Sequence, residues 1–177
     1  MKKIILMALL SVFASSANAG IFDSQSLQFQ YLFPDQSTPY AGASNGTFAV
    51  VAGVEISNIV DNRGSLDLQS DGFTANFTDT FPFTSSTFNG FRITDINGTI
   101  DPFTTFTVGS NTSGGNPVLT FDANNLYVNF QGLSYTPGSV QFNVGVAAVP
   151  EPETYAMMLA GLGLMGFVAR RRKEDQT

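Results

Sequence analysis

Apolar side chains recur at every second residue along most of the chain between residues 20 and 148, and this period restricts the local structure that the chain can form. The pattern is clearest where Leu27, Phe29, Tyr31 and Phe33 alternate with two glutamines and a leucine. A period of two is that of a β-strand, and no window here shows the period of about 3.6 that a helix needs. Enrichment in Phe, Val, Ile and Thr also favours strands. The predicted strands are 27–33, 48–56, 73–77, 91–96, 103–108, 118–121, 126–130 and 140–146.

Clusters of turn-forming residues separate these runs, among them Pro34–Ser37, Gly42–Gly46, Asn97-Gly98 and Thr136–Ser139. No helical segment intervenes between neighbouring strands, which favours antiparallel pairing. The chain has 17 phenylalanines and no tryptophan, so Phe rings would fill the space between two sheets. We therefore predict an all-β fold, an antiparallel β-sandwich of about eight strands over residues 20–148, flanked by an N-terminal signal helix and a C-terminal transmembrane helix.

The side-chain types that are missing exclude several functions. The chain has no Cys and no His, and residues 20–148 contain no Lys. A zinc site is therefore improbable. Gly42–Gly46 satisfies the Gly-x-Ser-x-Gly nucleophile pattern, but Ser44 has no histidine to act as its base, so we interpret the segment as a turn. Most carboxylates lie in predicted turns, where Asp serves the backbone, which disfavours a glycosidase. We predict no enzyme, no catalytic residue and no cofactor.

Charge excludes a further class of partner. Residues 20–148 hold ten acidic residues against Arg63 and Arg92, a net charge of −8. Such a domain has no basic surface on which a phosphate backbone would release counterions, so nucleic-acid binding is not expected. The absence of Cys means that the region must be stabilised by apolar burial, for which its length suffices.

A run of oxygen-bearing side chains between two predicted strands is a candidate cation site. Asp95, Asn97 and Asp101 occur in a segment with an oxygen ligand at nearly every second residue, which is typical of calcium loops. The glycine and glutamate that an EF-hand requires are not at their positions, and Asn97-Gly98 is a hairpin-turn signal. A plain turn is favoured and calcium is the alternative. Asp61, Asp67 and Asp71 form a second acidic candidate loop of the same kind.

Residues 1–19 have the organisation of a secretory signal peptide. Two lysines precede the apolar run 4–14, and small residues follow up to Ala17-Asn18-Ala19. The small-x-small triplet predicts cleavage between Ala19 and Gly20. The alternative is a short uncleaved anchor.

Residues 149–177 combine three features in order. Val149, Pro150, Glu151 and Pro152 are followed by an uncharged stretch, 154–169, and then by the basic cluster of Arg170, Arg171, Arg172 and Lys173. A helix over 154–169 would be about 24 Å long, slightly short of the roughly 30 Å hydrocarbon core, and bilayer thinning or snorkelling makes up the difference. The basic cluster would stay in the cytoplasm by the positive-inside rule. Gly161, Gly163 and Gly166 match a dinucleotide fingerprint, but they lie inside this predicted membrane helix, which excludes that interpretation.

This tail resembles the PEP-CTERM sorting signal of Gram-negative bacteria. The resemblance implies that the partner is a membrane-embedded exosortase, which acts near Pro-Glu-Pro, removes the helix and basic tail, and passes the protein from an inner-membrane intermediate to the cell surface. Such proteins are typical of bacteria that make exopolysaccharide or biofilm. The alternative is an ordinary single-pass anchor. Two further segments are similar to such proteins: Phe77-Thr78-Asp79-Thr80-Phe81 resembles the Phe-x-Asp-x-Phe subgroup, and 119–134 resembles a block common among exported proteins.

Two functions are consistent with these observations. The first is a non-catalytic exported surface or extracellular-matrix protein, associated with exopolysaccharide or biofilm. The alternative is a carbohydrate-binding module, in which calcium assists and in which Tyr31, Tyr40, Tyr127 or Tyr135 stacks on sugars.

Overall fold

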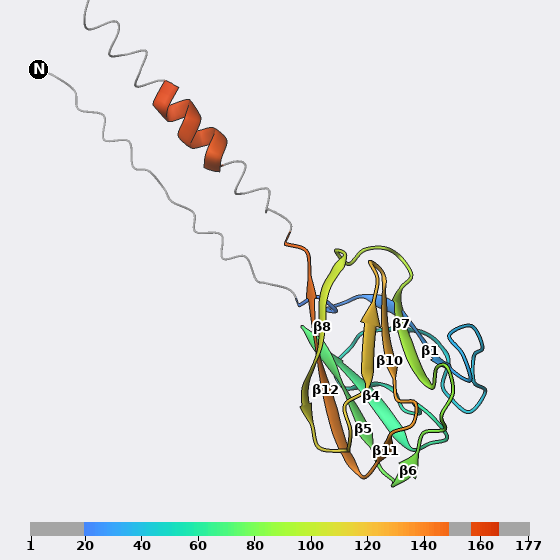
Figure 1. The fold of residues 1–177 in the computed structure, drawn as a ribbon. Helices are drawn as coiled ribbons and strands as arrows, with labels where there is room; N and C mark the ends of the chain where they lie inside the picture. Colours follow the sequence, from blue (N-terminus) through green and yellow to red (C-terminus); the bar gives the residue numbers. More distant parts are fainter. Residues whose placement is uncertain (1–19, 149–156, 167–177) are drawn as a thin grey trace, which may run out of the picture.

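The computed structural model describes residues 20–148 and 157–166 (Figure 1). Within these residues the chain forms twelve strands and one helix, the latter over 157–166. Two antiparallel sheets have five strands each: sheet I has the order β2-β1-β7-β10-β9 and sheet II the order β3-β4-β5-β12-β8, while β11 and β6 form a two-stranded sheet. The strands are β1 Ser26–Leu32, β2 Gly46–Ala49, β3 Val54–Ile56, β4 Gly64–Gln69, β5 Gly72–Phe77, β6 Phe81–Pro82, β7 Gly90–Asp95, β8 Phe103–Asn111, β9 Val118–Phe121, β10 Asn125–Asn129, β11 Ser134–Tyr135 and β12 Gly138–Val146.

Phenylalanine rings from both sheets meet in one core. Phe91 of sheet I has no exposed surface, and its ring centroid lies 5.5 Å from that of Phe29 in the same sheet. Across the core the Phe91 ring lies 6.0 Å from Phe73 and 6.5 Å from Phe142, both in sheet II. Full burial of a Phe side chain contributes about 1.5–3 kcal/mol. These rings join the inner faces of the two sheets.

The predicted all-β, antiparallel character is confirmed. The strands predicted at 27–33, 73–77, 91–96, 103–108, 118–121, 126–130 and 140–146 appear as β1, β5, β7, β8, β9, β10 and β12. The predicted number of about eight strands is too low. Strands β6 and β11 have only two residues each, too few for a period of two to be recognised, and two longer segments differ from the prediction.

The first misjudged segment is 48–56, which is two strands rather than one. Gly53 adopts a φ of 102°, a conformation that L residues rarely adopt, and this interrupts the extended backbone. The chain therefore passes from β2, which pairs with β1 in sheet I, to β3, which pairs with β4 in sheet II.

The second is β4, which the sequence predicts to be part of an acidic loop. Leu66 and Leu68 are buried in the core, while Asp67 lies on the other face of the strand, half exposed. Residues 64–69 alternate between buried and less buried side chains as other strands do, but the run is short and contains an aspartate, so its strand period is not evident from the sequence. Asp67 is consequently a strand residue and not a loop ligand.

The structure describes a helix over 157–166, which lies within the helix predicted over 154–169. At a rise of about 1.5 Å per residue its ten residues are about 15 Å long. Within the parts of the chain that the structure describes, no helix is both long and apolar enough to cross a membrane. The signal segment 1–19, the sorting residues 149–152 and the basic cluster 170–173 lie outside the described residues.

Both ends of the β domain lie at one end of the molecule, which we call the terminal end. Gly20, Val146 and Ala148 line the same hollow. Gly20 is already part of the fold there, because a Cβ at this position would overlap Ser70 and because the Phe22 N–H donates to the Ser70 carbonyl at 3.2 Å. β12 begins at Gly138, opposite Phe77, and runs to the terminal end. The opposite end, where β6 and β11 lie in Figure 1, is called the far end.

A substitution at Gly90 tests how closely β7 and β10 approach each other. A Cβ at Gly90 would overlap the carbonyl oxygen of Val128, whereas a Cβ at Gly46 would meet nothing within 4 Å. Gly90→Ala is therefore expected to lower the free energy of unfolding by about 2 kcal/mol, as measured by urea denaturation. The matched control Gly46→Ala should change it by less than about 0.5 kcal/mol. Equal effects of the two variants would contradict the described register.

Candidate functional site

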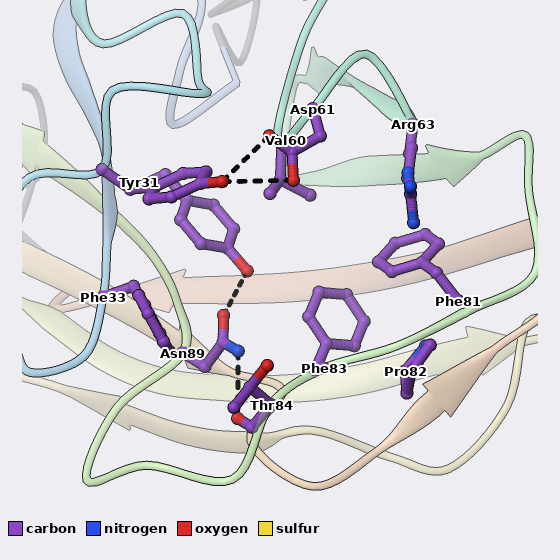
Figure 2. Close-up of a pocket in the computed structure, with 11 residues that line it drawn as sticks. Tyr31, Phe33, Val60, Asp61, Arg63, Phe81, Pro82, Phe83, Thr84 and Asn89 are labelled. Carbon is purple, nitrogen blue, oxygen red and sulfur yellow. Dashed lines mark hydrogen bonds between the residues drawn. The ribbon is translucent and has the colours of Figure 1, made fainter.

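A pocket of about 120 Å³ opens at the far end of the molecule (Figure 2). We call it the far-end pocket. It is built where β1 ends and β7 begins, because Leu32 pairs with Gly90, and where the loop before β4 meets the segment after β5, because the Thr78 N–H donates to the Arg63 carbonyl at 3.0 Å. The lining residues are Tyr31, Phe33, Tyr40, Val60, Asp61, Arg63, Phe81, Pro82, Phe83, Thr84 and Asn89.

The floor of the far-end pocket is a buried hydrogen-bond network. The Tyr31 hydroxyl donates to Oδ1 of Asn89 at 2.6 Å, and Nδ2 of Asn89 donates to the Thr84 carbonyl at 3.0 Å. Tyr31 and Asn89 are 1% and 7% exposed. Burial raises the pKa of Tyr31 far above its ordinary value, so the hydroxyl stays protonated and acts as a donor. The network fixes the orientation of the Asn89 amide.

One wall is formed by Tyr40 and Asp61. The Tyr40 hydroxyl donates to the two carboxylate oxygens of Asp61 at 3.0 and 3.3 Å, and this hydrogen bond raises the pKa of Tyr40. Asp61 and Asn62 have positive φ angles of 49° and 58°, which cost about 1 kcal/mol or more each in residues other than glycine. The Gly42 carbonyl, which accepts from the Asp61 N–H at 2.7 Å, helps to hold this turn.

Arg63 supplies the positive charge of the site. The central guanidinium carbon lies 5.3 Å from the centroid of the Phe81 ring, a cation–π contact worth about 0.5–1 kcal/mol at an exposed position. Arg63 itself is exposed, so its remaining N–H groups are open to solvent at the edge of the pocket. Asp61 and Arg63 together give the pocket one charge of each sign.

The arrangement offers a ligand both apolar and polar contacts. The lining set combines aromatic rings with hydrogen-bond donors and acceptors, among them the Tyr40 hydroxyl and the Asp61 carboxylate that it donates to. Among residues 20–148 and 157–166, no group of three or more His, Cys, Asp or Glu side chains is placed to hold a metal ion.

The structure separates the four tyrosines that were expected to stack on sugars. Tyr31 and Tyr135 are buried, with 1% and 0% of their surface exposed, so neither offers a ring face to a ligand on the surface. Tyr127 lies on the outer face of sheet I, opposite Arg92. Only Tyr40 of the four combines partial exposure with a place in the far-end pocket.

Asp95 contacts the backbone. It is 4% exposed, its Oδ1 accepts from the N–H groups of Asn97 and Gly98 at 3.2 and 3.0 Å, and its Oδ2 accepts from the Ile100 N–H at 2.8 Å. Asn97 and Asp101 are exposed. The turn connects β7 of sheet I to β8 of sheet II, so the hairpin signal at Asn97-Gly98 does not produce a hairpin: the chain leaves the sheet instead of returning to it.

The second acidic candidate loop does not exist as a cluster. Asp61 lies at the far-end pocket, Asp71 lines the hollow at the terminal end, and Asp67 lies on β4 between them. The six-residue strand β4 lies between Asp61 and Asp71 and holds these two carboxylates at opposite ends of sheet II.

Asn45 within Gly42–Gly46 is a structural residue that the sequence analysis missed. Its Oδ1 accepts from the Tyr31 N–H at 2.6 Å and its Nδ2 donates to the Tyr40 carbonyl at 2.7 Å. The segment is therefore tied to the two pocket tyrosines and is not a free turn. Arg63, Phe81 and Asn89 were also missed; the one available signal was that Arg63 is one of two cations between residues 20 and 148.

Comparison with known protein families gives a match at the C-terminal side of the chain. Residues 148–173 match the PEP-CTERM protein-sorting motif, a range that includes Val149 to Pro152 and Arg170 to Lys173. No curated protein and no solved structure matches the chain. The chain therefore carries a PEP-CTERM motif, which supports an exported protein with an exosortase as its processing partner. The match does not reach the Phe-x-Asp-x-Phe segment, in which Phe77 and Phe81 are core rings 6.0 Å apart.

Asp95→Asn tests whether this carboxylate serves the backbone or a cation. The variant replaces one acceptor oxygen by an amide donor and leaves a buried N–H group without a partner, so we expect a loss of about 1–3 kcal/mol in the free energy of unfolding. Asp101→Asn, at an exposed position of the same turn, should have almost no effect. Calcium is expected to leave the urea midpoint of the unmodified protein unchanged. A calcium-dependent increase that both variants abolish would show that the turn is a cation site.

Proposed function

We propose that this protein is a non-catalytic surface or extracellular-matrix protein with a β-sandwich body, which an exosortase delivers to the cell surface and which associates there with exopolysaccharide or biofilm. The observation that carries the proposal is the PEP-CTERM motif at residues 148–173. The motif then serves as a sorting signal, and the β domain over 20–148 is the part of the protein that remains at the cell surface.

The positions of the two domain ends support this division of roles. Gly20 and Ala148 line one hollow at the terminal end, so the leader that precedes the first and the tail that follows the second connect to the same end of the body. A domain attached to a membrane through this end directs its far end outward. The far-end pocket then faces the extracellular space before and after processing.

The charges of the tail support its proposed handling. Arg170, Arg171, Arg172 and Lys173 would hold the inner end of a helix over 154–169 at the cytoplasmic surface. The paired prolines Pro150 and Pro152 cannot continue a strand of the β domain, because proline has no backbone N–H to donate. The segment between body and membrane is thus kept available to a protease at the outer surface.

A carbohydrate-binding role is the second candidate. It is favoured by the far-end pocket, where the partly exposed rings of Phe33 and Tyr40 lie together with the polar groups of Asp61 and Arg63. Sites for sugars combine such ring faces with a few fixed polar groups.

The intact mass of the released protein tests the sorting proposal. We expect the extracellular form to begin at Gly20 and to lack Arg170 to Thr177, because cleavage near Pro-Glu-Pro removes the helix and the basic tail. A variant with both Pro150→Ala and Pro152→Ala should accumulate in the membrane fraction with its tail attached. Recovery of an extracellular species that still ends at Thr177 would contradict exosortase processing.

A further inference from the structure

We propose that the far-end pocket binds a single neutral pyranose ring, as presented by the end unit of a glycan. The inference names the ligand class for the carbohydrate-binding role given above and rests on that role. It does not depend on how the tail is processed.

The apolar part of the pocket fits one face of a sugar ring. Phe33 and Tyr40 are both partly exposed and meet edge to face with centroids 6.1 Å apart, whereas Phe81 and Phe83 are each 5% exposed and belong to the core beside them. Pyranose rings carry C–H groups on their faces, and these pack against aromatic rings while the hydroxyls around the edge stay available for hydrogen bonds. Tyr40 is the ring of this set that is partly exposed and also hydrogen-bonded at its hydroxyl.

The polar part of the pocket fits hydroxyl groups, which both donate and accept. An ionised carboxylate accepts about four hydrogen bonds, and the Tyr40 hydroxyl occupies only part of that capacity at Asp61. Arg63 offers guanidinium N–H donors close by, and a guanidinium never accepts. Adjacent hydroxyls of one sugar can therefore donate to Asp61 and accept from Arg63 at the same time.

The charge of the site favours a neutral sugar over an acidic one. Asp61 and Arg63 give the pocket no net charge, while residues 20–148 as a whole carry a net charge of −8. The field of the domain therefore repels a uronate or a sulfated sugar. A neutral ligand avoids this cost.

The size and rigidity of the pocket favour a single ring. Its volume of about 120 Å³ is well below the roughly 300–1,000 Å³ of pockets for drug-sized ligands. The hydrogen bonds of Asn45 to Tyr31 and Tyr40, and those of Asn89 to Tyr31 and Thr84, fix the lining before any ligand arrives. Binding therefore costs little ordering of the protein.

Saturation-transfer NMR on the full-length protein, purified from whole cells so that its recovery does not depend on export or processing, tests the inference. The probes are methyl β-glucopyranoside and methyl β-galactopyranoside as neutral rings and sodium glucuronate as the acidic one. We expect at least one neutral glycoside to bind with a millimolar dissociation constant and glucuronate to bind at least tenfold more weakly. Absence of binding by both neutral glycosides, or tighter binding of glucuronate, would overturn the proposal.

Variants locate the binding. Arg63→Gln is expected to weaken binding at least tenfold, and Asp61→Asn should also weaken it. The matched control is Arg92→Gln, because Arg92 is the other arginine of the domain and lies on the outer face of sheet I beside Gln30, to which it donates. Equal binding by the Arg63 and Arg92 variants, with thermal midpoints that show both to be folded, would place the ligand elsewhere. The intact mass of the extracellular form tests the sorting proposal separately. Failure of the sorting proposal can therefore be told apart from failure of the sugar-binding proposal.

Discussion

The packing of phenylalanine rings between the two sheets is the interaction on which the rest of the structure depends. The chain has no cysteine, so no disulfide holds the sheets together, and their contact rests on apolar burial. Phe91 contacts rings of both sheets, and Phe77 extends the same cluster to the far end through Phe83 at 6.2 Å and Tyr135 at 4.9 Å. The core that joins the sheets thus also positions the segment that carries Phe81 to Thr84, on which the far-end pocket is built.

The sorting motif and the folded β domain occupy different parts of the chain. The sorting motif occupies residues 148–173, whereas all twelve described strands lie within 26–146. The two ends of the domain meet at the terminal end, and the far-end pocket lies at the opposite end of the domain. Removal of the tail would leave the pocket and its hydrogen bonds untouched.

The sequence predicted well where one physical rule acts alone. Period-two alternation identified strands such as β5 and β12, and the order of motif, apolar stretch and cations identified the tail. It failed where conformation depends on contacts that are distant in sequence. Gly53 marks a change of sheet only because β1 and β4 are the available partners, and Asp95 turns its oxygens to the backbone because the chain leaves sheet I there. The far-end pocket unites Tyr31 with Asn89 across 58 residues, which no local pattern reveals.

The central claim is that residues 20–148 fold independently of the tail. Urea denaturation of a fragment of residues 20–148, compared with the chain from residue 20 to residue 177, tests this claim most directly. The account predicts one cooperative transition with the same midpoint in both proteins, because every buried core residue of the described structure lies within 20–148. A fragment that is unfolded in buffer, or whose midpoint is lower by about 1 M urea or more, would show that the tail is part of the folded body and would contradict the account.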